Sequence, residues 1–302
     1  MKKVMKWLGI VLAGLVGLVV LALVGVYFLS NQRINKHYDI QPAALIIPTD
    51  AASLAEGKRI FTVRGCGDCH KEDGRGSVLI DDPALGRFAA SNLTAGRGGV
   101  AQEYTDLDWA RAILHGVGPD GLPLLIMPSK EFNGLNDADL GALIAYIESL
   151  PPVDNELPPN RIGLLGRVLT VANQVPLLSA EEIDHNAPRP VAVQVAETAE
   201  YGAYLAQSCK GCHGAGMSGG PIPGVPEGPP YPANLTPDPE TGLAGWQQAD
   251  FVRVIREGKR PDGSAIDPTK MPWPAFNQMT DTELAALWLY LESLPPTPYG
   301  NR

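Results

Sequence analysis

The stretches Cys66-Gly67-Asp68-Cys69-His70 and Cys209-Lys210-Gly211-Cys212-His213 decide how this chain folds. In each of them two thiols stand three positions apart, so that on a short helical turn both can reach the vinyl groups of one haem. The histidine that follows directly can present its imidazole to the iron as the proximal ligand. The two motifs therefore predict two covalently bound c-type haems, with His70 and His213 as iron ligands.

Two other kinds of site use the same cysteine spacing. A single Cys-x-x-Cys pair fits a thioredoxin-like redox site, and two pairs together fit a four-cysteine zinc site. Here a histidine follows each pair, and the pairs lie in separate repeats, which favours haem. The chain has four cysteines, Cys66, Cys69, Cys209 and Cys212, and haem attachment assigns all of them. None is then left for a structural disulfide.

An internal repeat surrounds the motifs and defines the domains. Asn92-Leu93-Thr94 returns as Asn234-Leu235-Thr236, and Met127-Pro128 returns as Met271-Pro272. The final segment of each copy ends in Ser-Leu-Pro-Pro, at position 152 in the first copy and 296 in the second. The chain is therefore interpreted as one haem domain duplicated, with domain 1 at residues 51–152, an interdomain linker at 153–190 and domain 2 at 191–302.

Helical patterns recur at matched places in both copies. The segments 105–115 and 248–257 carry apolar residues at i and i+4 and end at a glycine. The segments that follow Asn136 and Thr280 begin with an N-cap residue, carry an apolar stripe and stop at a double proline. Ser53-Leu54-Ala55-Glu56 fits a capping box for a helix that leads to the first motif. We therefore expect mainly α domains whose apolar stripes form the core.

The sixth iron ligand is expected from the Met-Pro loops. Met127 lies 57 residues after His70, and Met271 lies 58 residues after His213. Proline after each methionine favours an extended loop, and a thioether ligand raises the reduction potential, as an electron carrier requires. The competing ligands fit the repeat less well, and they are Met217, Met279, His115 and His185.

Asn92 and Asn234 recur between the haem motif and the methionine loop. As Asn-x-Thr sequences they also match glycosylation acceptors of secreted eukaryotic proteins. Their matched positions favour loops that face the haem. We predict that they bind a haem propionate or order the methionine loop.

An apolar run of 23 residues, Trp7 to Leu29, contains no charge. As a helix it is about 34 Å long, enough to cross a bilayer. Lys2, Lys3 and Lys6 precede it and predict a cytoplasmic N-terminus. A cleaved signal peptide is the alternative, but the run is longer than such a core and no small-x-small cleavage site follows it. We therefore expect residues 1–29 to be an uncleaved signal anchor, followed by a tether at 30–50.

Composition limits the class of partner. The chain carries 33 Asp and Glu against 24 Lys and Arg, and three of these lysines lie in the first six residues. The acidic surface argues against nucleic acid and favours docking on basic proteins. In the linker, an apolar patch from Ile162 to Leu178 fits a short helix, which rests on a domain or on the bilayer; interdomain packing is the preferred interpretation.

With these motifs in view, both repeats resemble class I c-type cytochrome domains. The Pro-Asp-Gly before each methionine loop and the Ser-Leu-Pro-Pro after each last helix resemble the cytochrome subunits of membrane-bound alcohol and gluconate dehydrogenases. Those subunits typically carry three haem domains, whereas this chain has two. The resemblance implies helical domains, low-spin His/Met haems and electron transfer toward a quinone or an oxidase.

The predicted function is electron relay between redox partners of the periplasm or membrane. The partners expected are a membrane dehydrogenase, a quinol-oxidising complex or a terminal oxidase, with the lipid bilayer and without nucleic acid. The haem domains are expected to face the periplasm or cell exterior from a bacterial cytoplasmic membrane. A cytochrome subunit of a dehydrogenase complex is one alternative. A dihaem enzyme of the peroxidase type, with one labile distal ligand, is another, which the two matched methionines disfavour.

Overall fold

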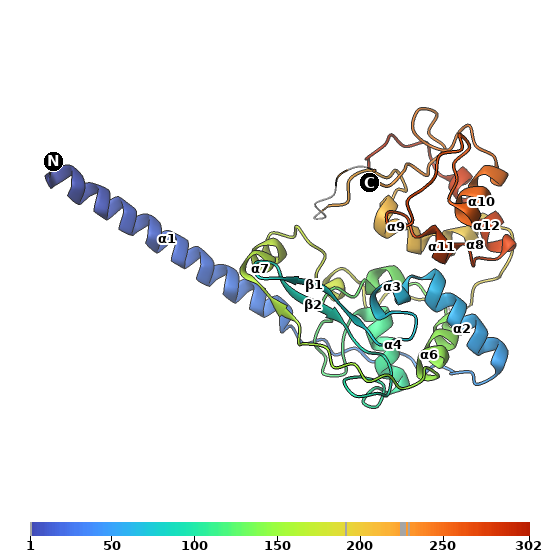
Figure 1. Ribbon diagram of the computed structural model, residues 1–302, viewed down its shortest axis with the longest axis horizontal. Coiled ribbons are helices and arrows are strands. Elements are labelled where there is room, and N and C mark those ends of the chain that lie inside the picture. Colours follow the sequence, from blue (N-terminus) through green and yellow to red (C-terminus); the bar gives the residue numbers. More distant parts are fainter. Residues whose placement is uncertain (1, 191, 224–227, 229) are drawn as a thin grey trace.

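The computed structural model describes residues 2–190, 192–223, 228 and 230–302, and it is mainly helical, as predicted (Figure 1). The elements of the anchor and of domain 1 are α1 (Lys2–Ile34), α2 (Ala51–Val63), α3 (Cys66–His70), β1 (Ser77–Asp82), β2 (Gly86–Ala90), α4 (Asp106–His115), α5 (Ser129–Phe132) and α6 (Asp137–Glu148). The linker holds β3 (Arg161–Ile162), α7 (Leu164–Val171) and the 3-10 turn η1 (Ser179–Glu181). Domain 2 contains α8 (Ala199–Leu205), α9 (Gln207–His213), α10 (Gln248–Glu257), α11 (Trp273–Phe276) and α12 (Asp281–Ser293).

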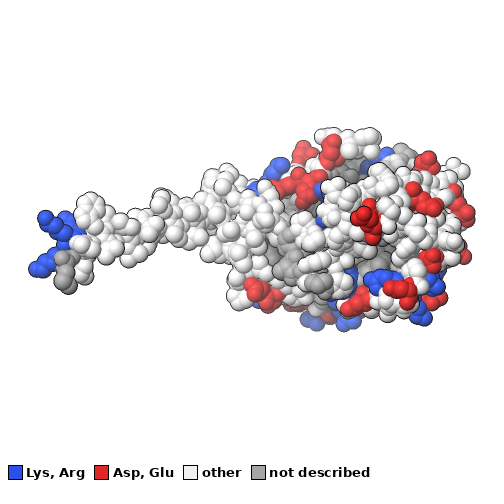
Figure 2. Space-filling view, turned by 90° about the horizontal axis from the view of Figure 1, so that it is seen from above, with Lys and Arg blue, Asp and Glu red and all other residues white. Residues whose placement is uncertain are grey.

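Helix α1 projects from the rest of the molecule as a single rod (Figure 1). Its side chains are exposed over most of its length, and it is long and apolar enough to cross a membrane. Figure 2 shows the lysines gathered at its free end, with an uncharged surface along the projecting length. The exposed apolar length of this helix fits a lipid environment, because lipid would cover its side chains.

Each domain is built on one helix crossing, α2 with α6 and α8 with α12. Glycine permits both crossings. A Cβ on Gly57 would lie 2.0 Å from the carbonyl oxygen of Ala142, and a Cβ on Gly202 would lie 2.0 Å from that of Ala286. Any side chain at these positions would push the helices apart. The matched glycines therefore set the same close packing in both copies.

Most predicted helix starts are confirmed, and one is wrong. Asn136 and Thr280 cap α6 and α12, and Thr105 forms a capping box at α4. Helix α2, in contrast, begins at Ala51, where Asp50 accepts hydrogen bonds from the backbone N–H groups of Ala52 and Ser53. A carboxylate one turn earlier satisfies these amides, so Ser53 lies inside the helix and is not its cap.

A small antiparallel sheet follows the first haem motif, in the order β1-β2-β3. Strands β1 and β2 pair from Ser77 with Ala90 to Asp82 with Gly86, and β3 adds Arg161 and Ile162 from the linker. Sequence analysis did not predict this sheet. Its third strand comes from residues about 75 positions later, a pairing that only the tertiary structure creates.

The linker packs on domain 1 and on the anchor. Helix α7 contacts α1 and β2, and Leu177 and Leu178 pack with Phe88 of β2. The interdomain packing expected for the apolar patch is therefore wrong for this segment. The cause is the sheet, which gives the patch an apolar surface within domain 1.

Candidate haem sites and the domain interface

Domain 1 contains a cavity that unites the residues predicted from its motif. Its empty volume is about 1040 Å³ and it opens to solvent. Cys66, Cys69, His70 and Met127 all line it, although 57 residues separate the histidine from the methionine. The rest of the lining is mostly apolar and includes Phe61 and Trp109. A cavity with two thiols, one imidazole and one thioether fits a c-type haem.

Both motif histidines are oriented in the same way. Nδ1 of His70 lies 2.8 Å from the carbonyl oxygen of Ser91, and Nδ1 of His213 lies 2.7 Å from that of Ala233. A carbonyl accepts, so Nδ1 carries the proton and Nε2 is left for the iron. Burial lowers the pKa of both imidazoles and favours the neutral form that a metal binds.

Asn92 and Asn234 directly follow the two carbonyls that orient the histidines. The amide of Asn92 donates to Val153 O at 2.7 Å, and the amide of Asn234 donates to Thr297 O at 2.8 Å. Each side-chain oxygen accepts from the threonine two positions later. Both side chains are buried and satisfied by protein groups. They are therefore better explained as clamps that hold the histidine-orienting loop than by the expected contact with a haem propionate or the methionine loop.

The two methionine loops share a local turn. The backbone N–H of Ser129 donates to Met127 O at 2.9 Å, and that of Trp273 donates to Met271 O at 2.7 Å. Short helices, α5 and α11, then follow. Met271 is partly buried against the domain core. Its role as a ligand stays a prediction.

The competing methionines are core residues. Met217 is fully buried and Met279 is 5% exposed, and both belong to the main hydrophobic cluster. Met279 also lines the cavity between the domains. This packing supports the choice of Met127 and Met271.

The thiols do not resemble those of a dithiol redox site. Burial raises the pKa of Cys66 to about 12 and that of Cys209 to about 11, whereas reactive pairs need a lowered pKa. Among the described residues, no three His, Cys, Asp or Glu side chains gather as a metal-binding group. Both observations weigh against the dithiol and zinc alternatives.

His115 and His185 form a pair that sequence analysis did not foresee. Their Nδ1 atoms lie 3.1 Å apart, and Nε2 of His185 lies 3.0 Å from Ala180 O. His115 is buried at the end of α4, and His185 contacts Tyr38 of the tether. The pair therefore fastens linker and tether to domain 1. In the sequence, His115 and His185 are two isolated histidines 70 positions apart, and no pattern there predicts that they pair.

The domains meet through two equivalent contacts. Arg59, two residues after Gly57, donates to Glu283 at 2.7 and 2.8 Å. Tyr204, two residues after Gly202, donates to Asp139. Asp139 and Glu283 are the third residues of α6 and α12. Because each domain offers the same two positions to the other, the interface has the character of a pseudo-twofold contact.

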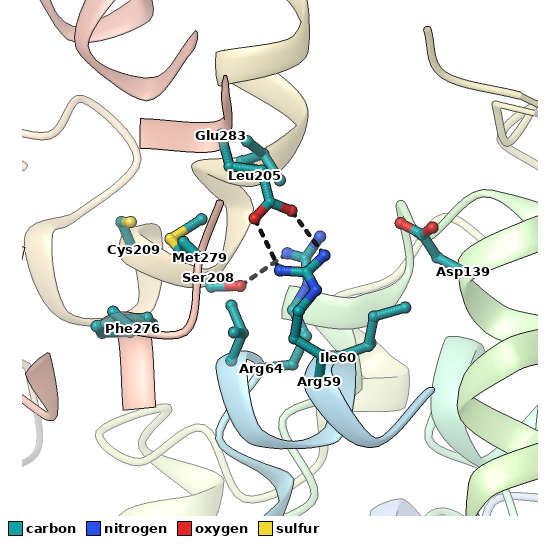
Figure 3. Close-up of a pocket in the computed structure, with 11 residues that line it drawn as sticks. Arg59, Ile60, Arg64, Asp139, Leu205, Ser208, Cys209, Phe276, Met279 and Glu283 are labelled. Atoms are coloured by element: carbon teal, nitrogen blue, oxygen red, sulfur yellow. Dashed lines mark hydrogen bonds and ion pairs between the residues drawn. The ribbon is translucent and has the colours of Figure 1, made fainter. Parts of the chain in front are cut away.

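This interface brings the two haem-attachment segments together (Figure 3). Arg64, two residues before Cys66, donates to Ser208 Oγ at 2.7 Å, and Ser208 directly precedes Cys209. Cys209 itself lines the cavity between the domains. Helix α5, which follows Met127, also packs on α9, the second motif helix. The sites are therefore adjacent across the interface.

Glu131 of α5 lies against the second haem motif. Its Oε1 would lie 2.2 Å from a Cβ at Gly211, so a side chain at that position would require the flexible Glu131 carboxylate to shift. Burial raises the pKa of Glu131 to about 7. This contact is part of the packing of α5 on α9.

Comparison with known proteins identifies the repeat. The family model described as cytochrome c matches residues 54–151 and 199–295. Both matches lie within the ranges predicted for the two domains. Together they cover well over half of the chain.

Three relatives illustrate the range of similar proteins. The fructose dehydrogenase cytochrome subunit of Gluconobacter japonicus is 33% identical over 271 residues, which are 82% of this chain and 54% of that protein. The alcohol dehydrogenase (quinone) cytochrome c subunit of Gluconobacter oxydans is 26% identical over 285 residues, 83% of this chain and 57% of that protein. The diheme cytochrome c-type protein of Cereibacter sphaeroides is 29% identical over 103 residues, 31% of this chain and 34% of that protein. The chain spans about half the length of these relatives or less.

Proposed function

This chain belongs to the cytochrome c family and is an electron-transfer protein with two c-type haems. We propose that it relays electrons from a membrane dehydrogenase through both haems in turn. The haems supply one-electron chemistry. The protein attaches them through four cysteines and orients their proximal histidines. The two haem sites then form one path within a single chain.

The observation that carries this proposal is the hydrogen bond between Arg64 and Ser208. It joins Arg64, two residues before Cys66, to Ser208, the residue directly before Cys209, so the two attachment segments meet across the interface. The ion pair between Arg59 and Glu283 is largely buried and holds the same surfaces together. Outer-sphere transfer needs close cofactors and no open coordination position, and these contacts support the first condition.

The second condition depends on Met127 and Met271 as distal ligands. We propose that both bind iron, which closes each site to substrate. The shared cavity of His70 and Met127 supports this for domain 1. The matched turn at Met271 supports it for domain 2.

The proposed location is the bacterial cytoplasmic membrane. Helix α1 would span it with the lysine-bearing end in the cytoplasm, and both haem domains would face the periplasm. The dehydrogenase names of the relatives support a dehydrogenase as electron donor. A quinol-oxidising complex or a terminal oxidase is the proposed acceptor.

The ferric absorption spectrum of the purified holoprotein tests the relay. We expect a methionine-to-iron charge-transfer band whose intensity accounts for two haems, and no binding of carbon monoxide to the reduced protein. High-spin haem in either domain, or ready binding of carbon monoxide, would favour the peroxidase-type enzyme instead. Affinity purification from solubilised membranes tests the donor, since a chain that purifies without a dehydrogenase would contradict that part.

A further inference from the structure

Helix α7 exposes three apolar side chains on one face. Leu164, Leu165 and Val168 are 53%, 44% and 37% exposed. They lie at i, i+1 and i+4, so they share one face of the helix. The opposite face is buried at Gly166 and Thr170. An exposed apolar face on an otherwise acidic protein indicates a contact surface.

The buried face of α7 is fixed firmly to domain 1. A Cβ on Gly166 would lie 2.2 Å from Leu85 O, in the turn between β1 and β2. The N–H of Leu165 donates to Ala84 O at 3.0 Å. The exposed face is therefore held in one orientation by the sheet, and it cannot turn inward.

Helix α7 is also tied to α1 at the end of the apolar run. Nη1 of Arg167 donates to Ser30 Oγ at 2.8 Å, and its guanidinium lies 4.5 Å from the centroid of the Tyr27 ring. Arg33, one turn further on, donates to Thr170 O and to Glu181. These contacts place α7 beside the residues at which α1 ends its uncharged segment (Figure 1).

That segment ends with Tyr27 and Phe28, and both side chains are exposed. Aromatic residues concentrate where a spanning helix crosses from hydrocarbon to headgroups. Since Arg167 stacks on Tyr27, α7 lies at this same depth. Arginine suits the position, because its stem can pack on apolar groups while the guanidinium reaches the polar layer.

We propose that α7 lies in the membrane interface, with Leu164, Leu165 and Val168 inserted into the leaflet from which α1 emerges. The proposal rests on the proposed membrane-spanning role of α1. A short amphipathic helix with leucines on one face is suited to this layer. With α1 and α7 both engaged, domain 1 has two attachments to the bilayer, which fix its rotation about the axis of α1.

A spin label at position 165 tests this in the full holoprotein, reconstituted in phospholipid nanodiscs. The four native cysteines carry haem, so Leu165→Cys adds the only thiol that the label can modify. Leu289→Cys on α12, which is 38% exposed in domain 2, is the matched control. We expect the label at 165 to collide with dissolved oxygen more often, and with a water-soluble nickel complex several-fold less often, than the label at 289. Unchanged haem spectra of both variants show that they fold.

The outcomes separate the two proposals. Equal accessibility of the labels to the nickel complex, in protein that stays in the disc, would overturn insertion of α7 and leave the α1 anchor intact. Protein that does not enter discs would contradict the anchor itself, and the insertion with it. A second test places the label at Val168→Cys, with and without the double substitution Leu164→Glu/Leu165→Glu. The two carboxylates should keep α7 out of the leaflet and so raise the accessibility of the label to the nickel complex.

Discussion

Domain 1 and domain 2 follow their haem motifs with different structures. In domain 1 the chain after His70 forms the hairpin β1-β2, which β3 extends. In domain 2 the matching segment contains six prolines between positions 221 and 232, and its described part forms no strand. Proline lacks the N–H that a strand must donate. Among the described residues the sheet belongs to domain 1, and it carries α7.

The domains agree, in contrast, in three elements around the predicted haem ligands. The glycine crossing, the asparagine clamp and the turn after the methionine occur in both with nearly the same distances. The duplication has kept the elements that shape the haem site. The differences lie where the domains meet other surfaces, and four predictions test this comparison.

The largest expected effect concerns the distal ligands. Met127→Ala and Met271→Ala should each convert one haem to a high-spin form and lower its potential by on the order of 0.2 V, since axial ligands set the potential. Spectroelectrochemical titration measures both. Met279→Leu, a volume-conserving change in the core, is the control and should keep both charge-transfer bands. A charge-transfer band that keeps its full two-haem intensity in the Met271 variant would show that the domains differ in ligation.

The next effect concerns the helix crossings. Gly57→Ala and Gly202→Ala should each destabilise one domain by about 3 kcal/mol, because the new methyl group meets a carbonyl oxygen at 2.0 Å. Urea unfolding followed at the haem bands measures it. Gly134→Ala, where a Cβ meets nothing within 4 Å, is the control and should change the stability little. If only one of the two domains responds, the crossings are not equivalent.

A smaller effect is expected at the interface. Glu283→Gln keeps the cap of α12 but leaves Arg59 with only Glu56 as a charged partner, which should cost about 2 kcal/mol. It should also separate the unfolding of the domains and slow electron transfer between the haems. Asp281→Asn removes an exposed ion pair with Arg256 and serves as control. Unchanged transfer rates in Glu283→Gln would mean that this pair does not position the haems.

The smallest effect concerns the histidine pair, which domain 2 lacks because Glu257 stands at the place of His115. Burial lowers the pKa of His115 to about 4, with His185, Arg189 and Arg111 adding to the effect. Between pH 6.5 and 4 the unfolded chain therefore binds a proton that the folded chain does not, so stability falls as the pH falls. Thermal unfolding at each pH should show His115→Gln reducing this loss in domain 1, by about 1 kcal/mol. A parallel loss in the variant would assign it to other groups.

The haem motifs, the duplication and the long apolar N-terminal helix could all be recognised from the sequence alone. The reason is that each depends on short-range spacing. Two thiols and an imidazole must fit one porphyrin, an apolar helix must match a bilayer, and caps such as Asn136 and Thr280 act within one turn. Such constraints involve only a few consecutive residues or the residues of one helix.

The assembly of these parts can be seen only in the folded chain. Four contacts join residues that lie 70 or more positions apart. They are the pairing of β2 with β3, the hydrogen bond of His115 with His185, that of Arg64 with Ser208, and the packing of α7 on α1. The periodicity of apolar residues along the sequence does not predict such contacts, because they depend on which surfaces remain uncovered once the helices and strands have formed. The placement of the two haem motifs beside each other therefore follows from packing.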